Sequence, residues 1–283
     1  MISRNALIVC LSLSAALAGG SAALGKDWKT VVVGTEGGYP PYNLTDSAGK
    51  IVGFEPDLLA DLCARMKVEC KTIAQDWDGM IPGLQAGKFD VIMDGMSITD
   101  DRKKVIDFSA PYASPPAIFL ALKTSPLAKV PENGKIVSLD ANSKDADQAI
   151  KDLQAAAKGL TIGVQVSTTH ASFADKYLKG FATIKEYKTT DERDLDLKSG
   201  RIDFELDDQP TIAGVLDHPD TGDLAIVGPQ FIGGVFGIGN GFGLRKSDAD
   251  LTAMFDKALQ GAIADGSVSK YSVKWFKIDV TPK

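Results

Sequence analysis

Cysteine and histidine are scarce in this sequence: its 283 residues include three cysteines and two histidines. Cys63 and Cys70 do not form a CxxC pair, and neither His170 nor His218 stands at a metal-ligand spacing from them. The sequence has no GxSxG turn, and two histidines give no Ser/His/Asp grouping that spacing could support. The residues therefore predict no metal site, no cofactor and no catalytic residues.

Long apolar runs are also scarce, and the one at residues 6–18 lies near the N-terminus. Arg4 precedes it and small residues follow it, which is typical of a secretory signal peptide. The run is shorter than the ~20 apolar residues that a membrane span needs. We expect residues 1–25 to be a signal peptide, cut after Ala23 or Gly25, and the mature protein to be periplasmic. An uncleaved N-terminal anchor is the alternative.

An excess of basic residues is absent as well. The sequence has 31 Lys and Arg against 37 Asp and Glu, and loss of Arg4 with the signal peptide leaves a mature net charge near −7. Because no basic stripe is present, nucleic acid is not an expected partner. This mild acidity modestly favours a cationic solute. The roughly 258 residues that remain suffice for two lobes of ~100–150 residues each.

Cys63 and Cys70 are the only cysteines outside the signal peptide. In an exported protein such a pair is expected to form a disulfide. The bridge would join a helix ending near Met66 to the strand that begins at Cys70. For so short a loop it would stabilise the fold by roughly 2–3 kcal/mol.

A short phrase occurs twice in the sequence, once in Leu84–Gly95 and once in Leu197–Asp208. Each copy predicts a helix end, a glycine stop, a short strand and acidic residues at the strand's C-terminal end. The glycines, Gly87 and Gly200, are 113 positions apart, too far for a solenoid repeat and suited to two α/β lobes of similar plan. Since ligands bind beyond the carboxyl ends of strands in such sheets, we expect a cleft between the lobes.

Strands and helices alternate along the mature chain. Crossings between the lobes are expected near Pro111–Pro116 and Phe231–Gly237. They would divide the chain into lobe 1, residues 26–114 and 236–283, and lobe 2, residues 115–235. The expected strands are 30–34, 70–73, 89–93, 117–122, 160–164, 183–187 and 202–206. The expected helices are 56–66 with Glu55 as its cap, 77–86, one around 145–158, 171–178, 190–198, 249–265 and 267–276.

Polar groups that could bind a solute follow the predicted strand ends of both lobes. Arg102, in a helix capped by Thr99, offers a planar fork that matches a carboxylate. Thr168 precedes a helix, where hydroxyls and free amides bind anions. Asp208 could neutralise an ammonium group. Each residue alone has a simpler explanation as a cap, a turn or a surface residue, but together they supply receptors for a carboxylate and an ammonium.

Several motifs resemble the polar and basic amino-acid-binding proteins of bacterial ABC importers, and the resemblance extends over nearly the whole mature chain. It implies an α/β fold of the type II periplasmic-binding-protein class, in which two βαβ lobes are joined by two hinge segments. The motifs are Gly34–Tyr42, Gly53–Leu58, Trp77–Leu84, Ser97–Arg102, Gly243–Lys246 and Trp275–Phe276.

The resemblance also implies roles for individual residues. Arg102 and Thr169 would clamp an α-carboxylate with Ser97 beside them, and Asp208 would bind the α-amine. The full set of expected ligand-binding residues is Glu36, Tyr39, Trp77, Asp94, Gly95, Ser97, Arg102, Gln165, Thr168, Thr169, His170 and Asp208.

For the ligand's distal end, the resemblance implies that Tyr39 and Trp77 sandwich its side chain and that Glu36 meets a cationic or polar group. Asp94 and Gly95 depart from the family pattern, because basic amino-acid binders typically carry two serines there. A carboxylate at this place would add a second cation receptor or a receptor for sugar hydroxyls.

Two further features resemble the octopine- and nopaline-binding branch, namely the run Gly163–His170 and the long segment between Lys123 and Gly159. We therefore expect a receptor that captures an opine or a basic amino acid by lobe closure and delivers it to an inner-membrane ABC permease, acting as a monomer. A sugar–amino-acid conjugate such as a mannityl opine, or a glutamine-like amino acid, is the alternative ligand.

An enzyme is a further alternative, because a few relatives of this fold resemble dehydratases that act on prephenate-like compounds. Glu36, Asp94 or His170 could supply the required acid or base, but each has a binding or capping explanation. We therefore expect no enzymatic activity. A purely signalling receptor would need a separate partner.

Overall fold

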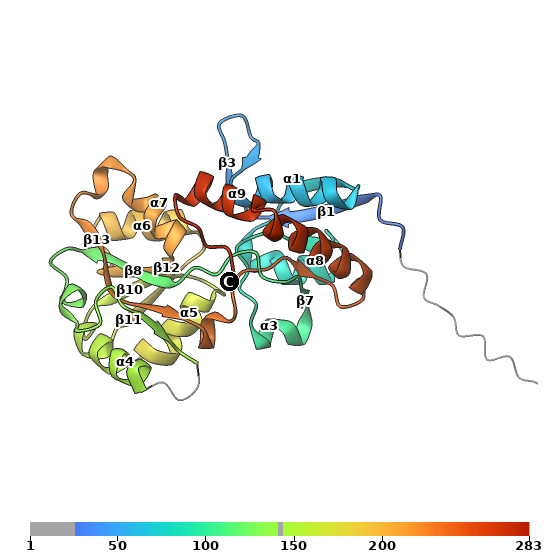
Figure 1. Cartoon of the computed structure of the whole chain (residues 1–283). Helices are drawn as coiled ribbons and strands as arrows, with labels where there is room; N and C mark the ends of the chain where they lie inside the picture. The colour runs from blue at the N-terminus through green and yellow to red at the C-terminus, as the bar shows by residue number, and fades with distance from the viewer. Residues whose placement is uncertain (1–25, 141–143, 283) are drawn as a thin grey trace, which may run out of the picture.

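The computed structural model describes residues 26–140 and 144–282, so the predicted signal peptide lies outside the described residues. Two lobes lie side by side, each with a β-sheet flanked by helices (Figure 1). This arrangement confirms the predicted α/β class with two lobes. Within the described ranges, no helix has the length and apolar character of a membrane span.

The first lobe contains both ends of the described chain. β1 pairs in parallel with β5 and β6, whereas β14, from the C-terminal part of the chain, pairs antiparallel with β6 and β7, in the order β5-β1-β6-β14-β7. The elements are β1 (Thr30–Thr35), α1 (Phe54–Met66), β5 (Glu69–Ala74), η1 (Trp77–Gly79), α2 (Met80–Gln85), β6 (Val91–Ile92), α3 (Asp100–Val105), β7 (Asp107–Phe108), β14 (Gly243–Leu244), α8 (Ala249–Ala264) and α9 (Ser267–Phe276).

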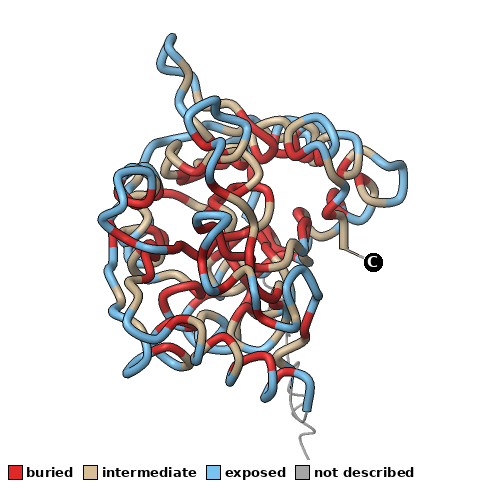
Figure 2. The backbone as a smooth tube through the Cα atoms, turned by 90° about the vertical axis from the view of Figure 1, so that its left-hand side faces the viewer, coloured by how far each residue is buried: buried red, intermediate tan, exposed pale blue. Residues whose placement is uncertain are grey.

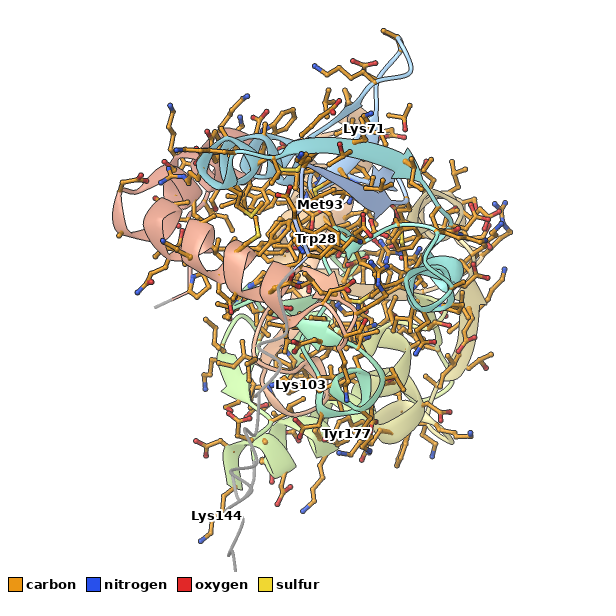
Figure 3. The ribbon with its side chains drawn as sticks, turned by 90° about the vertical axis from the view of Figure 1, so that its right-hand side faces the viewer. Trp28, Lys71, Met93, Lys103, Lys144 and Tyr177 are labelled. Carbon is orange, nitrogen blue, oxygen red and sulfur yellow. A yellow bond between two sulfur atoms is a disulfide. The ribbon has the colours of Figure 1, made fainter. Side chains whose placement is uncertain are left out.

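Apolar faces of α1, α8 and α9 build the core of this lobe. Leu58 and Leu62, one turn apart on α1, are fully buried in one cluster with Leu259 of α8. Trp28 and Met93 belong to the same core and lie inside the lobe (Figure 3). The predicted disulfide is confirmed: Cys63 on α1 is bonded to Cys70 on β5, with their Cα atoms 6.2 Å apart.

The second lobe has a six-stranded sheet in the order β11-β10-β12-β8-β13-β9. β10 pairs in parallel with β11 and β12, whereas β8 runs antiparallel to β12 and β13. The elements are β8 (Ala117–Leu122), η2 (Pro126–Lys129), β9 (Ile136–Ser138), α4 (Lys144–Ala156), β10 (Thr161–Gln165), α5 (Thr169–Phe173), η3 (Ala174–Leu178), β11 (Thr183–Tyr187), α6 (Thr190–Lys198), β12 (Phe204–Asp208), α7 (Gln209–Leu216), η4 (Pro219–Thr221), β13 (Leu224–Ile232) and η5 (Gly234–Phe236).

A third, small sheet stands above the first lobe. Its strands β2 (Gly38–Tyr39), β3 (Asn43–Thr45) and β4 (Ile51–Val52) pair antiparallel. The sequence did not predict these strands, because two or three residues are too few to show an alternating pattern.

Some predicted boundaries were wrong. The first helix begins at Phe54 rather than Pro56, and Gly53, not Glu55, is its N-cap, with a φ of 138° that favours glycine. The second-lobe strand of the repeated phrase is Phe204–Asp208 rather than 202–206. The predicted helix 171–178 is α5 followed by a π-helical turn. The strands β9 and β13 and the helix α7 were not predicted.

The chain passes between the sheets twice. Residues 109–116 lead from β7 to β8, and residues 233–242 lead back from β13 to β14. The two passages touch, since Ala113 and Asn240 form an isolated antiparallel bridge. The lobe boundaries given above stay a prediction. Figure 2 shows buried segments inside the molecule and exposed ones mostly around its outside.

Candidate functional site

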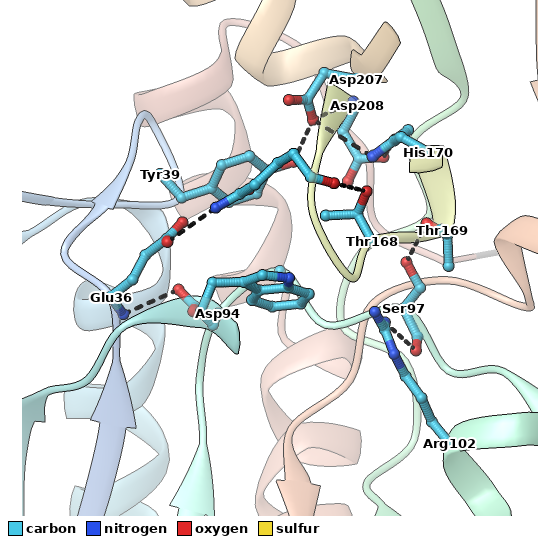
Figure 4. Close-up of a pocket in the computed structure, with 13 residues that line it drawn as sticks. Glu36, Tyr39, Asp94, Ser97, Arg102, Thr168, Thr169, His170, Asp207 and Asp208 are labelled. Carbon is cyan, nitrogen blue, oxygen red and sulfur yellow. Dashed lines mark hydrogen bonds and ion pairs between the residues drawn. The ribbon is translucent and has the colours of Figure 1, made fainter. Parts of the chain in front are cut away.

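A pocket lies where strand ends of the two lobes face each other (Figure 4). All twelve residues predicted to bind ligand line it, and Asp207 is the one addition. Their binding roles stay predictions. The lining residues are Glu36, Tyr39, Trp77, Asp94, Gly95, Ser97, Arg102, Gln165, Thr168, Thr169, His170, Asp207 and Asp208.

Arg102, Ser97 and Thr169 lie at one end of the pocket (Figure 4). Thr99 caps α3 by accepting the backbone N–H of Arg102, as predicted. The Arg102 guanidinium donates to the carbonyl oxygen of Ser97 at 3.0 Å and, across the cleft, to that of Ser167 at 3.2 Å. The hydroxyls of Ser97 and Thr169 are 3.3 Å apart, one from each lobe.

This end of the pocket is suited to an anion. Burial lowers the pKa of Arg102 to about 10, and the nearby charge of Asp208 opposes that shift, so the guanidinium stays charged at neutral pH. Its charge lies over the Trp77 ring, 5.3 Å from the ring centroid. A charged fork next to hydroxyls from both lobes can bind a carboxylate.

Glu36, Glu55 and Asp94 form a group of carboxylates at the other end, which we call the acid cluster. Asp94 accepts a hydrogen bond from the backbone N–H of Glu36 at 3.2 Å, and Glu36 accepts one from Gln165 of the second lobe at 3.2 Å. Glu55 is fully buried behind them. Within residues 26–140 and 144–282, no Lys, Arg or His nitrogen lies within 4.0 Å of any of the three carboxylates.

Burial and repulsion between neighbouring acids determine the electrostatics of the acid cluster. Burial raises the pKa of Glu36 to about 7, the Gln165 hydrogen bond opposes the shift, and the charges of Asp207 and Glu55 add to it. Burial also raises the pKa of Asp94 well above its usual value, and the charges of Glu36 and Glu55 raise it further. The Oδ2 atom of Asp94 is buried without a hydrogen-bond partner among the described residues.

The second lobe carries a comparable group of buried acids but includes a cation. Arg193 of α6 is fully buried and forms ion pairs with Asp194, Glu205 and Asp207. Arg193 therefore partly neutralises these three carboxylates from within the protein. The acid cluster of the first lobe has no equivalent.

Asp208 and His170 lie next to this group. The His170 Nε2 atom is 3.3 Å from the Oδ1 of Asp208 and is buried without a hydrogen bond in the described part of the chain. The other oxygen of Asp208 accepts from the Tyr42 hydroxyl at 3.3 Å and from the Asn240 amide at 3.4 Å. A carboxylate held in this way can receive an ammonium group.

Tyr39 was expected to sandwich the ligand's side chain with Trp77, but much of it contacts other parts of the protein. Its ring stacks on Tyr42, with centroids 5.0 Å apart, and its hydroxyl donates to Asp207 across the cleft at 2.7 Å. A Cβ atom on Gly95 would lie 2.7 Å from the Tyr39 ring, and the Gly95 N–H donates to Glu55 at 2.8 Å. Gly95 therefore gives space to Tyr39, and its N–H is already used.

Three residues that shape the site were not predicted to do so: Asn43, Glu55 and Arg193. Asp207, which adjoins Asp208 in the repeated phrase, lines the pocket outside the predicted ligand-binding set. Arg193 lies in a charged stretch of α6 that is typical of an exposed helix. No local pattern distinguishes Asn43 or Glu55. In the described ranges no group of three or more side chains could hold a metal ion.

Comparison with known proteins then identifies the family. The model of the bacterial extracellular solute-binding proteins, family 3, matches residues 31–278. The chain belongs to this family.

Several known binding proteins match most of the length of this chain. An octopine-binding periplasmic protein of Rhizobium meliloti is 41% identical over 90% of this chain and 92% of its own. An L-arginine-binding protein of Pseudomonas aeruginosa is 32% identical over 89% and 90%, respectively. Among solved structures, an ancestral arginine-binding protein bound to arginine has a TM-score of 0.73 and 30% identity, over 88% of this chain and 98% of that one. These relatives are binding proteins, and this family 3 member is likewise a solute-binding receptor rather than an enzyme.

Proposed function

We propose that this family 3 receptor captures an amino acid, or an amino-acid-derived opine, whose side chain ends in a cation. The observation that carries the proposal is the acid cluster: Glu36 and Asp94 line the pocket, Glu55 is buried behind them, and the cluster has no cation of its own among the described residues. Buried carboxylates are costly unless a charge partner neutralises them. A guanidinium or ammonium group of the ligand would be that partner.

The rest of the pocket supports an amino-acid head group. Arg102 with Ser97 and Thr169 would bind the α-carboxylate, and Asp208 would bind the α-amine. Trp77 would cover the aliphatic part of the side chain. Closing the lobes would bury the ligand, because these groups come from both lobes. The closed form would then deliver the ligand to an ABC permease from the periplasm, with the receptor acting as a monomer.

Arginine and octopine both present a guanidinium, and the named relatives include binders of each. Four of the lining residues are acidic and one is an arginine. The second carboxylate of an opine would therefore enter a pocket whose charged lining is mostly negative. This balance favours arginine, lysine or ornithine, whereas the higher identity to the octopine-binding protein favours the opine.

The test is isothermal titration of mature protein that has been unfolded and refolded to remove carried-over ligand. Citrulline is the matched control, because it replaces the guanidinium of arginine by a neutral group of similar shape. Hydrogen bonds to charged groups contribute about 1.5–3 kcal/mol, so arginine should bind roughly 10- to 100-fold more tightly than citrulline. Equal affinity for the two, or binding of mannopine or glutamine alone, would overturn the proposal.

A further inference from the structure

Asn43 lies directly behind the acid cluster and does not line the pocket. It is fully buried on β3 of the small sheet. Its Oδ1 accepts the N–H of Gly37 at 2.9 Å, and its Nδ2 donates to Glu55 at 2.8 Å and to Asp94 at 2.9 Å. A flipped amide would place nitrogen against an N–H and oxygen against two carboxylates, so these partners fix its orientation.

The two oxygens of Asp94 differ as a result. Oδ1 accepts from the Asn43 amide, and also from the Glu36 N–H at 3.2 Å and the Thr35 hydroxyl at 3.4 Å. Oδ2 is buried without a partner in the described ranges, on a residue that lines the pocket. The protein thus supplies its donors to one oxygen and leaves the acceptor capacity of the other for a ligand.

Asn43 also links Asp94 to Glu55, whose position is fixed by several hydrogen bonds. Glu55 accepts hydrogen bonds from the Gly95 N–H at 2.8 Å and from the Tyr112 hydroxyl as well as from Asn43. The amide therefore stands between two carboxylates and donates one hydrogen to each. This arrangement reduces their mutual repulsion and keeps Asp94 from turning toward Glu55.

We infer that Asn43 is the positioning residue of the subsite for the ligand's cationic end, because it holds Asp94 with Oδ2 available to that cation. The inference rests on the proposed function. Without Asn43, Asp94 loses the closest of its three donors, and the two carboxylates face each other directly, which favours protonation of one of them. Asn43 has no hydrogen bond to Arg102 or Asp208, so recognition of the amino-acid head group does not depend on it.

The experiment measures the ratio of arginine to citrulline affinity by titration calorimetry. Asn43→Ala should reduce this ratio by roughly tenfold, with citrulline affinity within threefold of the parent. Asn43→Leu, which keeps a similar volume but has no donor, should give the same result if the cavity left by the alanine variant makes that variant fold poorly. Asn133→Ala is a control for loss of an asparagine side chain away from the pocket, where the amide oxygen accepts the backbone N–H of Gly228 in the second lobe.

A double-mutant cycle shows whether Asn43 acts through Asp94. In the Asp94→Asn background, removal of Asn43 should cause no further loss of the affinity ratio. If Asn43→Ala and Asn43→Leu weaken both ligands equally, the role is structural and the inference is wrong. If the parent protein itself does not distinguish arginine from citrulline, the proposed function fails instead, so the two failures are separable.

Discussion

At the scale of single residues, the two lobes differ in whether their buried carboxylates have a cationic partner among the described residues. Arg193 partly neutralises the buried acids of the second lobe. The acid cluster of the first lobe has hydrogen-bond donors, such as Asn43 and Gln165, but no cation in the described part of the chain. The consequences concern protonation and ligand charge, and both can be measured.

Affinity for a cationic ligand should depend on pH through Glu36, whose pKa is raised to about 7. Below that value the carboxylate gains a proton, so arginine affinity should fall as pH decreases from 8 to 6. Proton uptake or release during titration, measured in buffers of different ionisation enthalpy, provides the check. A Glu36→Gln variant should bind more weakly at pH 8 and show a flatter pH profile. An unchanged profile in that variant would contradict the assignment.

The same shift has the opposite effect on the stability of the protein without ligand. Because the folded pKa of Glu36 lies above the usual 4.5, the folded state binds more protons between these values. The contribution of Glu36 to stability is therefore fully present below about pH 4.5 and is lost as pH rises through about 7. The melting temperature of Glu36→Gln relative to the parent should increase between pH 5 and pH 8.

Arg102 provides a second prediction at this scale. A fork that binds a carboxylate cannot be replaced by the point charge of lysine without loss of one hydrogen bond. Arg102→Lys should weaken arginine binding by roughly tenfold or more, corresponding to about 1.5–3 kcal/mol for a bond to a charged group. Agmatine, which lacks the α-carboxylate, is the control ligand, and its affinity should change much less. Equal losses for arginine and agmatine would argue against carboxylate binding by Arg102.

At the scale of elements, the sequence predicted those that carry a periodic pattern or a turn signal. The repeated phrase located β6 and β12, and the capping residue Thr99 located α3. The small sheet was missed, and Asn43 with it, because its strands are too short for a pattern. Arg193 was missed for another reason: its burial depends on Glu205 and Asp207, which lie on the following element, β12, and face Arg193 only after folding.

The disulfide also belongs to this scale. It fixes the end of α1 to β5, and neither cysteine lines the pocket. Replacing both cysteines by serine should lower the free energy of unfolding by roughly 2–3 kcal/mol, as expected for a short loop. Urea denaturation would measure this loss. Arginine affinity at 25 °C should remain within about twofold, and a large change would show that the bridge shapes the site.

At the scale of the whole molecule, hydrogen bonds and ion pairs that join the lobes favour the closed arrangement. Lys188, before α6, forms an ion pair of 2.6 Å with Asp76, which precedes Trp77. The Thr190 hydroxyl donates to the carbonyl oxygen of Gly38 at 3.2 Å. Both contacts lie outside the pocket lining, so they contribute to closure without contributing to ligand choice.

Reversing one charge of the Lys188–Asp76 ion pair should therefore weaken the binding of all ligands by the same factor. Exposed ion pairs contribute about 0.2–1 kcal/mol, so Lys188→Glu should reduce affinity by a few-fold, more at low salt than at high salt. The ratio of arginine to citrulline affinity should not change. The charge-swapped pair, Asp76→Lys with Lys188→Glu, should restore affinity. A loss confined to arginine would instead place Lys188 in the binding site.

The acid cluster has one more consequence, which concerns the proposed permease rather than the ligand. Closing the lobes without ligand removes these carboxylates from water, and their raised pKa values mean that protons must then supply the missing charge. An unloaded receptor should therefore close less readily as pH rises above about 7. A permease that binds only the closed receptor would then bind mainly receptors that carry ligand. The lack of a cation beside the acid cluster, among the described residues, would thereby reduce the number of empty receptors that occupy the permease. Fewer ATP molecules would then be hydrolysed without transport.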